Sequence, residues 1–222
     1  MSPRRGLATA DPWAVVAALR VVPVAVIDDA GQAQRLGETL VAAGLPCIEV
    51  TLRTPAALDA LRDISGVEGL LAGAGTVIRQ QQVEAALDAG ARFIVSPGLS
   101  LPVLRACAQA GVPYLPGVAT ATEIQLALDE GIDTVKLFPA ELLGGPAMIS
   151  ALAAPFGEVR FVPSGGITAH NAAGYLALPN VLAIGGSWMV APTLLAAGDF
   201  AAVGELAGTV VSAAANMLGA TS

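Results

Sequence analysis

Lysine is almost absent from this sequence: Lys136 is the only one among 222 residues, whereas arginine occurs ten times. Histidine is as scarce, with His170 alone, and the two cysteines, Cys47 and Cys107, stand in no CxxC or Cys/His spacing. These absences argue against a disulfide framework, a metal site and a histidine-based catalytic triad. We expect both cysteines to be core thiols and His170 to lie on the surface, and we expect no metal or cofactor.

Long hydrophobic runs are also missing, although 55% of the residues are hydrophobic and only 13% are charged. The apolar runs stay well below the roughly 18 residues of a membrane span, and the N-terminus shows no secretory signal. We therefore expect a cytoplasmic protein with a large core. A net charge of −7 without basic clusters argues against nucleic acid and membranes as partners. Any anionic ligand has to be held by local geometry.

Short β-rich segments alternate with helical ones about eight times. The predicted strands are almost continuously apolar, which is typical of a parallel sheet covered by helices. We predict an α/β fold, a (β/α)8 TIM barrel that forms a single domain over residues 1–222. The alternative is a doubly wound open sheet, but "GAGTVI" (73–78) lacks the third glycine of a dinucleotide fingerprint. The predicted strands are 21–27, 46–52, 69–75, 92–98, 112–118, 132–138, 159–165 and 181–186.

Several predicted helices have clear ends. Helical periodicity covers residues such as 30–43, 79–89, 120–129 and 199–216, and glycines that suit a helix C-terminus stand at 44, 90, 111 and 131. An extra N-terminal helix is predicted over 11–19, because Asp11 and Pro12 suit the N-cap and the first helical position. We expect this helix to plug the bottom of the barrel.

Polar side chains concentrate where the predicted strands end, which is the catalytic end of such a barrel. Lys136 lies near the end of the sixth strand. Its neighbours in the chain, Val135, Leu137 and Phe138, predict a desolvated amine. A desolvated lysine is more readily neutral and can then attack a carbonyl group, which a permanently protonated arginine cannot do. We predict that Lys136 forms a Schiff base; a lysine that merely reaches out from a strand end is the alternative.

Glu49 lies between two apolar residues of the second strand, where a carboxylate is costly unless it is paired. We predict that it acts as a general acid and base beside Lys136, and a purely structural ion pair is the alternative. Arg53 shares the strand parity of Glu49 and is suited to hold a substrate carboxylate with two hydrogen bonds. A salt bridge at the rim is the alternative for Arg53.

Glycine doublets follow the last two predicted strands, in "PSGGI" (163–167) and "IGGSW" (184–188). In (β/α)8 barrels the loops after strands 7 and 8 often bind phosphate through backbone amides. Two doublets in these consecutive loops predict a phosphate site. We expect Trp13 and Trp188 to be packing residues.

Six ordered motifs together resemble the 2-keto-3-deoxy-6-phosphogluconate (KDPG) aldolase family, which includes 4-hydroxy-2-oxoglutarate aldolases. They are the two glycine motifs with "IEVTLRT" (48–54), "GAGTV" (73–77), "SPG" (96–98) and "VKLFPAE" (135–141). The resemblance covers nearly the whole chain. It implies a class I, metal-independent aldolase, a lyase of the Entner-Doudoroff pathway, that acts on a 2-keto acid sugar phosphate, releases pyruvate and is usually a homotrimer.

Carried over by motif, the resemblance assigns the site. It implies that Lys136 is the Schiff-base lysine and that Glu49 is the general acid and base. It also implies substrate binding by Arg53 and Thr76 at the carboxylate, by Pro97 in the pocket wall, and by Ser164, Gly165, Gly166, Gly186 and Ser187 at the distal hydroxyl and phosphate. Leu142 and Leu143 depart from the family pattern, and we expect the substrate range to differ there.

Other functions remain open from the sequence. An aldolase for the galactonate epimer of KDPG is the nearest alternative. A sugar-phosphate epimerase or isomerase would use carboxylate bases and would need no lysine imine. A non-catalytic oligomeric scaffold would leave the burial of Lys136 and Glu49 unexplained.

Overall fold

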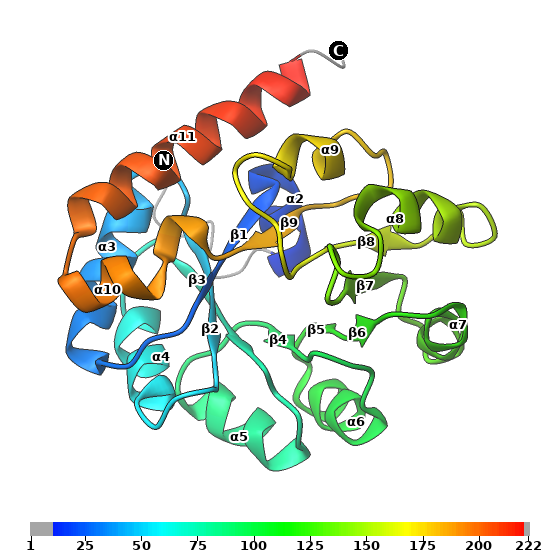
Figure 1. Ribbon diagram of the computed structural model, residues 1–222. Helices are drawn as coiled ribbons and strands as arrows, with labels where there is room; N and C mark the ends of the chain where they lie inside the picture. The colour runs from blue at the N-terminus through cyan, green and yellow to red at the C-terminus, as the bar shows by residue number, and fades with distance from the viewer. Residues whose placement is uncertain (1–10, 220–222) are drawn as a thin grey trace, which may run out of the picture.

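The strands of this protein run parallel to their neighbours and follow one another around a ring (Figure 1). The computed structural model describes residues 11–219. Its apolar strand segments correspond closely to the predicted ones, although several are only two residues long. The strands are β1 (Val21–Ala25), β2 (Cys47–Thr51), β3 (Leu71–Gly75), β4 (Ile94–Val95), β5 (Tyr114–Leu115), β6 (Gly117–Val118), β7 (Thr134–Leu137), β8 (Arg160–Phe161) and β9 (Ile184–Gly186).

The regular hydrogen bonding between the strands is interrupted at two places, which divides the closed ring into two sheets. The predicted strand 112–118 divides into β5 and β6 at Pro116, whose nitrogen has no hydrogen to donate. The carbonyl of Pro116 still accepts from the Lys136 amide at 2.8 Å, so the strand continues toward β7. On the other side, β8 reaches β9 through the bridges Phe161 to Val181 and Ser164 to Gly185.

The ring therefore has eight strand positions. The order β5-β4-β3-β2-β1-β9 joins the order β6-β7-β8 at both of these breaks. This confirms the predicted (β/α)8 barrel, and the open doubly wound sheet is wrong.

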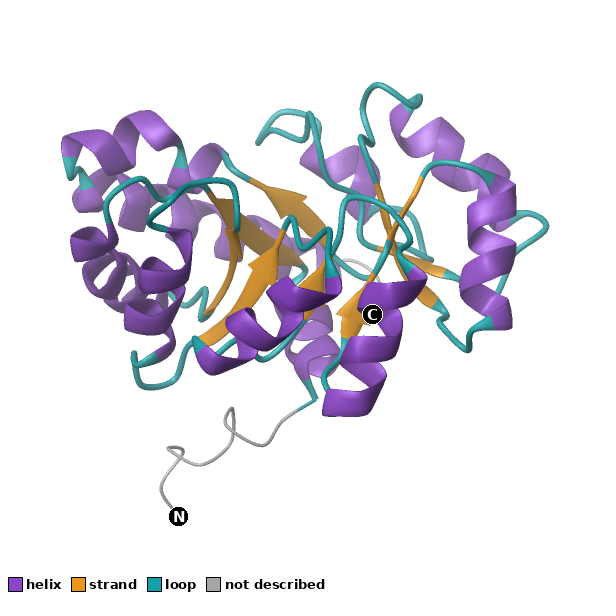
Figure 2. Ribbon diagram, turned by 90° about the horizontal axis from the view of Figure 1, so that it is seen from below, coloured by secondary structure: helices purple, strands orange, loops and turns teal. Residues whose placement is uncertain are grey.

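The connecting helices lie outside the strands (Figure 2), and they join successive strand positions of the ring. The predicted glycines 44, 90, 111 and 131 all adopt left-handed backbone angles just after a helix. The connecting helices are α3 (Ala33–Ala42), α4 (Ala57–Ser65), α5 (Gln80–Asp88), α6 (Leu101–Ala110), α7 (Ala121–Asp129), α8 (Gly145–Ala153) and α9 (Ala172–Leu176). The chain ends with α10 (Pro192–Ala197) and α11 (Phe200–Gly219), and short 3-10 turns stand at η2 (Ala30–Gln32) and η3 (Trp188–Val190).

The extra N-terminal helix forms as predicted, as α2 (Pro12–Leu19). Its N-cap residue Asp11 accepts a hydrogen bond from the Trp13 amide, and Pro12 occupies the first turn. The helix places Val16 against the side chains that fill the lower barrel interior, including Phe93 and Leu115. Helix α2 therefore closes the bottom of the barrel.

Apolar side chains form two cores that share the strands. One core fills the space between the barrel and the surrounding helices, and the smaller one fills the lower interior above α2. Cys47 and Cys107 are both buried, as predicted for core thiols. Burial raises the pKa of the Cys107 thiol to about 12, and it also raises the pKa of Cys47, helped by the nearby Glu49 carboxylate.

Among the helices of the described chain, none has the length and apolar character to cross a membrane.

Candidate functional site

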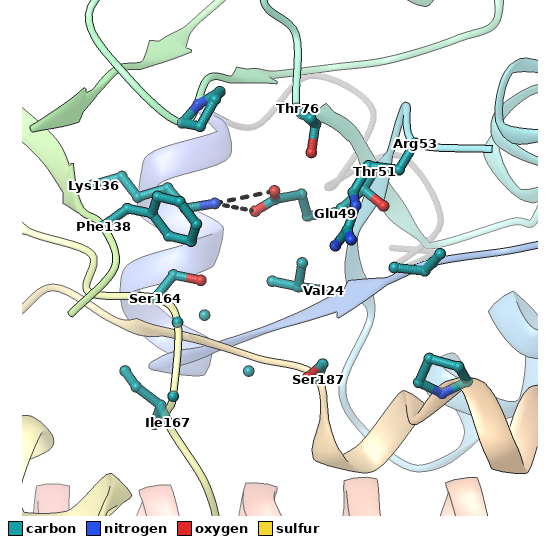
Figure 3. A pocket seen from close by; sticks show the side chains of 17 residues that line it. Val24, Glu49, Thr51, Arg53, Thr76, Lys136, Phe138, Ser164, Ile167 and Ser187 are labelled. Atoms are coloured by element: carbon teal, nitrogen blue, oxygen red, sulfur yellow. Dashed lines mark hydrogen bonds and ion pairs between the residues drawn. The ribbon is translucent and has the colours of Figure 1, made fainter. Parts of the chain in front are cut away.

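A cavity of about 410 Å³ opens at the carboxyl ends of the strands (Figure 3). Because the strands are parallel, each contributes the residues at its end to this one space. All ten predicted site residues line the cavity: Glu49, Arg53, Thr76, Pro97, Lys136, Ser164, Gly165, Gly166, Gly186 and Ser187.

Lys136 and Glu49 meet across the barrel interior. The Lys136 Nζ lies 3.2 Å from Glu49 Oε1 and 3.4 Å from Oε2, although the two residues come from β7 and β2. Only 6% of Lys136 and 4% of Glu49 are exposed to solvent. The carboxylate is therefore close enough to exchange a proton with the amine, and each side chain compensates the cost of burying the other.

The surroundings of Lys136 differ from the prediction. Val135 and Leu137 belong to the core between the barrel and its helices, because alternate residues of a strand point to opposite faces. The prediction that these two residues desolvate Lys136 is therefore wrong. Phe138 does share the inner face, and its ring centroid lies 5.5 Å from the Lys136 Nζ.

Arg53 and Thr76 lie on the same side of the cavity as Glu49, beyond the ends of β2 and β3 (Figure 3). Within the described part of the chain, Arg53 has no carboxylate within ion-pair distance, so the rim salt bridge does not form. Its guanidinium is available to an anion. Thr76 has a φ of 57°, an uncommon backbone state for a β-branched residue. Figure 3 shows its hydroxyl directed into the cavity.

The opposite side of the cavity is built from the glycine motifs. Gly165 and Gly166 have φ values of 95° and 81°, which side chains rarely tolerate. Gly185 leaves room for Ser164, whose Oγ would lie 2.8 Å from a Cβ placed there. Trp188 packs its ring directly on Gly186, in agreement with its predicted packing role. This side offers backbone amides and hydroxyl groups in place of formal charges.

Some lining residues escaped the prediction. Val24 and Val26 alternate along β1 and the residue after it, so strand parity would have placed them on the inner face. Thr51 shares the strand parity of Glu49, and its hydroxyl donates to the Ala25 carbonyl. Gly185, from β9, and Ile167 belong to the two glycine motifs, although neither was given a role of its own. Phe138 and Pro192 complete the lining from beyond the strand ends.

Two other expectations concern residues away from the cavity. Leu142 and Leu143 do not line it: Leu142 is 87% exposed, and Leu143 packs against the outer core. After Pro139 the chain turns away over the loop after β8, where the Ala140 amide donates to the Ser164 carbonyl. The two leucines therefore do not line this cavity, and their expected influence on substrate range stays a prediction. His170 is exposed, as predicted.

Comparison with known proteins gives consistent matches. The family model described as "KDPG and KHG aldolase" matches residues 14–206. The 2-dehydro-3-deoxy-phosphogluconate aldolase of Treponema pallidum is 50% identical over 189 residues, which are 85% of this chain and 90% of that protein.

Solved structures agree. The KDPG aldolase of Legionella pneumophila, with pyruvate captured as a covalent carbinolamine intermediate, matches with a TM-score of 0.85 and 41% identity over 90% of this chain and 98% of that one. The Zymomonas mobilis enzyme with 3-phosphoglycerate matches with a TM-score of 0.84 and 42% identity, over 89% of this chain and 93% of that one.

Proposed function

The chain belongs to the KDPG and KHG aldolase family and is thus a lyase; from this premise we propose that it cleaves KDPG into pyruvate and glyceraldehyde 3-phosphate by a Schiff-base mechanism. Cleavage of 4-hydroxy-2-oxoglutarate is proposed as a second activity. The observation that carries the proposal is the contact of the sole, buried lysine, Lys136, with Glu49 at 3.2 Å.

The first half of the reaction forms the imine. Glu49 takes a proton from the Lys136 ammonium, and the neutral amine adds to the C2 ketone of the substrate. The resulting carbinolamine loses its hydroxyl as water, with a proton supplied from Glu49. The product is a protonated imine, whose positive nitrogen can accept electrons from the bond to be broken.

The second half breaks the C3–C4 bond. Glu49, through a water molecule, removes the proton of the C4 hydroxyl, and the bonding electrons move into the imine to form an enamine. Glyceraldehyde 3-phosphate leaves with its new C4 aldehyde. Protonation of the enamine at C3 restores the imine, and water then releases pyruvate and regenerates Lys136.

Both ends of the substrate have proposed partners. Arg53 and Thr76 would hold the C1 carboxylate, because Arg53 is free of carboxylate partners in the described chain and faces the cavity. Pro97 would line the pocket wall. The distal hydroxyl and phosphate would bind at the glycine side, with Ser164, Gly165, Gly166, Gly186 and Ser187. Binding the distal phosphate orients the reacting carbons, so its loss should lower the rate as well as the affinity.

Trapping with borohydride tests this mechanism directly. After incubation with pyruvate and reduction, we expect one stable adduct on Lys136, located by peptide mass spectrometry. The chain offers no other lysine, so the adduct has to be distinguished only from one on the N-terminal amine. Lys136→Arg should keep the charge and the fold but abolish both adduct formation and KDPG cleavage. An unmodified Lys136 in folded protein, or an active Lys136→Arg variant, contradicts the mechanism.

Substrate preference separates the remaining candidates. We expect a higher kcat/KM for KDPG than for its galactonate epimer or for 4-hydroxy-2-oxoglutarate, measured with lactate dehydrogenase to detect pyruvate. A preference for the galactonate epimer would identify the alternative aldolase. Interconversion of sugar phosphates without pyruvate release would identify an epimerase or isomerase, and no turnover of any of these would favour the scaffold.

Three features of the biological setting are also proposed. We propose that residues 1–222 act as one barrel domain and that three chains assemble into a homotrimer, which sedimentation analysis can test. We also propose a cytoplasmic role in the Entner-Doudoroff pathway. A sugar acid phosphate carries several charges and does not cross a bilayer, so an enzyme that consumes it acts in the compartment where it is made.

A further inference from the structure

The loop after β8 is tied to the loop after β7 by a carboxylate that does not line the cavity. Glu141 Oε2 accepts hydrogen bonds from the Tyr175 hydroxyl at 2.6 Å and from Asn171 Nδ2 at 3.1 Å. The Glu141 amide donates to the carbonyl of Gly165 at 3.0 Å. We call Glu141, Asn171 and Tyr175 the latch.

Asn171 makes a second link between the latch and the loop after β8 that contains Gly165 and Gly166, which we call the glycine loop. Its Nδ2 donates to the carbonyl of Gly166 at 3.1 Å, and its Oδ1 accepts from the Thr168 amide at 2.8 Å. The backbone partners on both sides fix which end of the amide is oxygen and which is nitrogen. An amide side chain is required here, because the position has to donate and accept at the same time.

These bonds determine where the loop amides point. A trans peptide carries its C=O and N–H on opposite sides. Because the carbonyls of Gly165 and Gly166 face the latch, the amide hydrogens of Gly166 and Ile167 point to the other side of the loop. Both residues line the cavity, and within the described residues neither amide has an acceptor. Two unpaired donors at a cavity wall suit an anion.

The loop needs this support because it is intrinsically adaptable. Gly165 and Gly166 are both in the left-handed region, and glycine reaches many other conformations at similar energy. The fit to the latch is close: a Cβ on Gly166 would lie only 2.5 Å from the Cβ of Glu141. Tyr175, which is fully buried, anchors the carboxylate from α9. The latch is therefore a rigid backing against which a flexible loop adopts one orientation.

We propose that Glu141, Asn171 and Tyr175 are positioning residues that aim the Gly166 and Ile167 amides at the distal phosphate of the substrate. The inference rests on the proposed function for the identity of the substrate. No latch residue lines the cavity, so the latch acts through the loop and not by contact with the substrate.

Asn171→Asp is the sharpest test, because it keeps the shape of the side chain and the acceptor for Thr168. It replaces the donor to Glu141 and Gly166 by a second carboxylate oxygen, so the loop is released. We expect the KM for KDPG to rise about tenfold or more, as for the loss of a hydrogen bond with charge repulsion added. The rate of pyruvate trapping on Lys136 should stay at the wild-type value, because pyruvate has no distal group.

Tyr175→Phe is the second variant, since it removes one hydroxyl and keeps the buried ring. We expect a rise of about two- to tenfold in the same KM. The matched control is Asn180→Asp, which adds the same charge before β9, where the Asn180 Nδ2 is buried without a partner in the described chain. This control should leave the KM unchanged.

Titration with glycerol 3-phosphate, followed by calorimetry, measures the same effect without any aldol chemistry. The dissociation constant should rise in Asn171→Asp and Tyr175→Phe but not in Asn180→Asp. The proposal is overturned if the wild type does not bind glycerol 3-phosphate, if both latch variants bind it normally, or if they slow pyruvate trapping as much as KDPG cleavage. Failure of the wild type to trap pyruvate would instead contradict the proposed function, and the titration would still decide the role of the latch.

Discussion

Glu49 can reach Lys136 because the neighbouring strand carries a glycine. A Cβ on Gly75 would lie 2.1 Å from Glu49 Oε1 and 2.6 Å from its Cγ. The carboxylate thus occupies the space that a side chain on β3 would fill. At the residue scale, the contact between Lys136 and Glu49 therefore requires a residue without a Cβ at position 75.

Gly75→Ala should therefore lower the kcat for KDPG cleavage by about a hundredfold or more, the usual effect of losing a general acid and base. The new methyl group displaces Glu49 from Lys136. Steady-state kinetics measures the effect, and thermal unfolding should show a folded protein with the modest loss expected of overpacking. Gly208→Ala is the matched control, because a Cβ there meets no atom within 4 Å. A kcat near the wild-type value in Gly75→Ala would show that Glu49 does not need this space.

Single residues were predictable where burial is costly. Lys136 and Glu49 stood out because a charge among apolar neighbours requires a reason. The orientation of the residues next to Lys136 was harder to predict. Val135 and Leu137 were wrongly expected to desolvate Lys136, because adjacent residues of a strand point to opposite faces. Glu141 belongs to a motif that had been recognised, but its partners Asn171 and Tyr175 lie 30 and more positions further on.

Helix α2 illustrates what a single element contributes. It covers the lower end of the barrel, where Trp13 packs against Phe93 with ring centroids 5.7 Å apart. A void of only about 10 Å³ remains between this floor and the Lys136–Glu49 pair. Such a space is at the lower limit for a water molecule and is lined mostly by apolar groups. Helix α2 therefore excludes bulk water from the lower side of the Lys136–Glu49 pair.

Trp13→Ala should lower the free energy of unfolding by about 2 to 3 kcal/mol, somewhat less than for a fully buried tryptophan, because Trp13 is partly exposed. Urea denaturation at 25 °C measures the change. Trp13→Phe retains an aromatic contact with Phe93 and should lose less than half as much. Equal stability of Trp13→Ala and the wild type would mean that α2 does not support the barrel.

Element boundaries were predicted less well than element types. The strands were expected to span six or seven residues, but β4, β5, β6 and β8 have two residues each. Prolines at positions such as 97, 116 and 163 have no backbone hydrogen to donate, which shortens the regular ladders. The residues beyond these short strands still follow the barrel wall and supply Pro97, Ser164, Gly165 and Gly166 to the site.

Closure of the barrel depends on contacts between the two ends of the strand order. Arg20 precedes β1 with a φ of 64°, and its guanidinium donates to the carbonyls of Val181, Leu182 and Leu176 at 2.6, 3.1 and 2.7 Å. These carbonyls belong to the segment that runs from α9 toward β9. At the scale of the whole molecule, one arginine joins the start of the first strand to the end of α9 and to the segment that leads into the last strand, β9.

Arg20→Ala should lower the free energy of unfolding by about 2 to 3 kcal/mol, since three charge-assisted hydrogen bonds are lost and water replaces them only in part. Arg20→Gly relieves the left-handed backbone but loses the same bonds, so it should also be destabilised. Urea denaturation compares the two. If Arg20→Gly is as stable as the wild type, the hydrogen bonds do not contribute to closure.

The sequence by itself determined the repeated strand and helix pattern and the plug helix, and it singled out Lys136 and Glu49, because periodicity, caps and the cost of buried charge are local properties. The complete set of ten candidate site residues followed only from the resemblance of its motifs to a known family. Only the tertiary structure decided that Lys136 and Glu49 meet at 3.2 Å, that Gly75 makes room for them and that the latch backs the glycine loop. Lys136 and Glu49 lie 87 positions apart in the chain, Glu141 and Tyr175 lie 34 apart, and no local rule relates such positions. The closing of the strands into a ring brings them together.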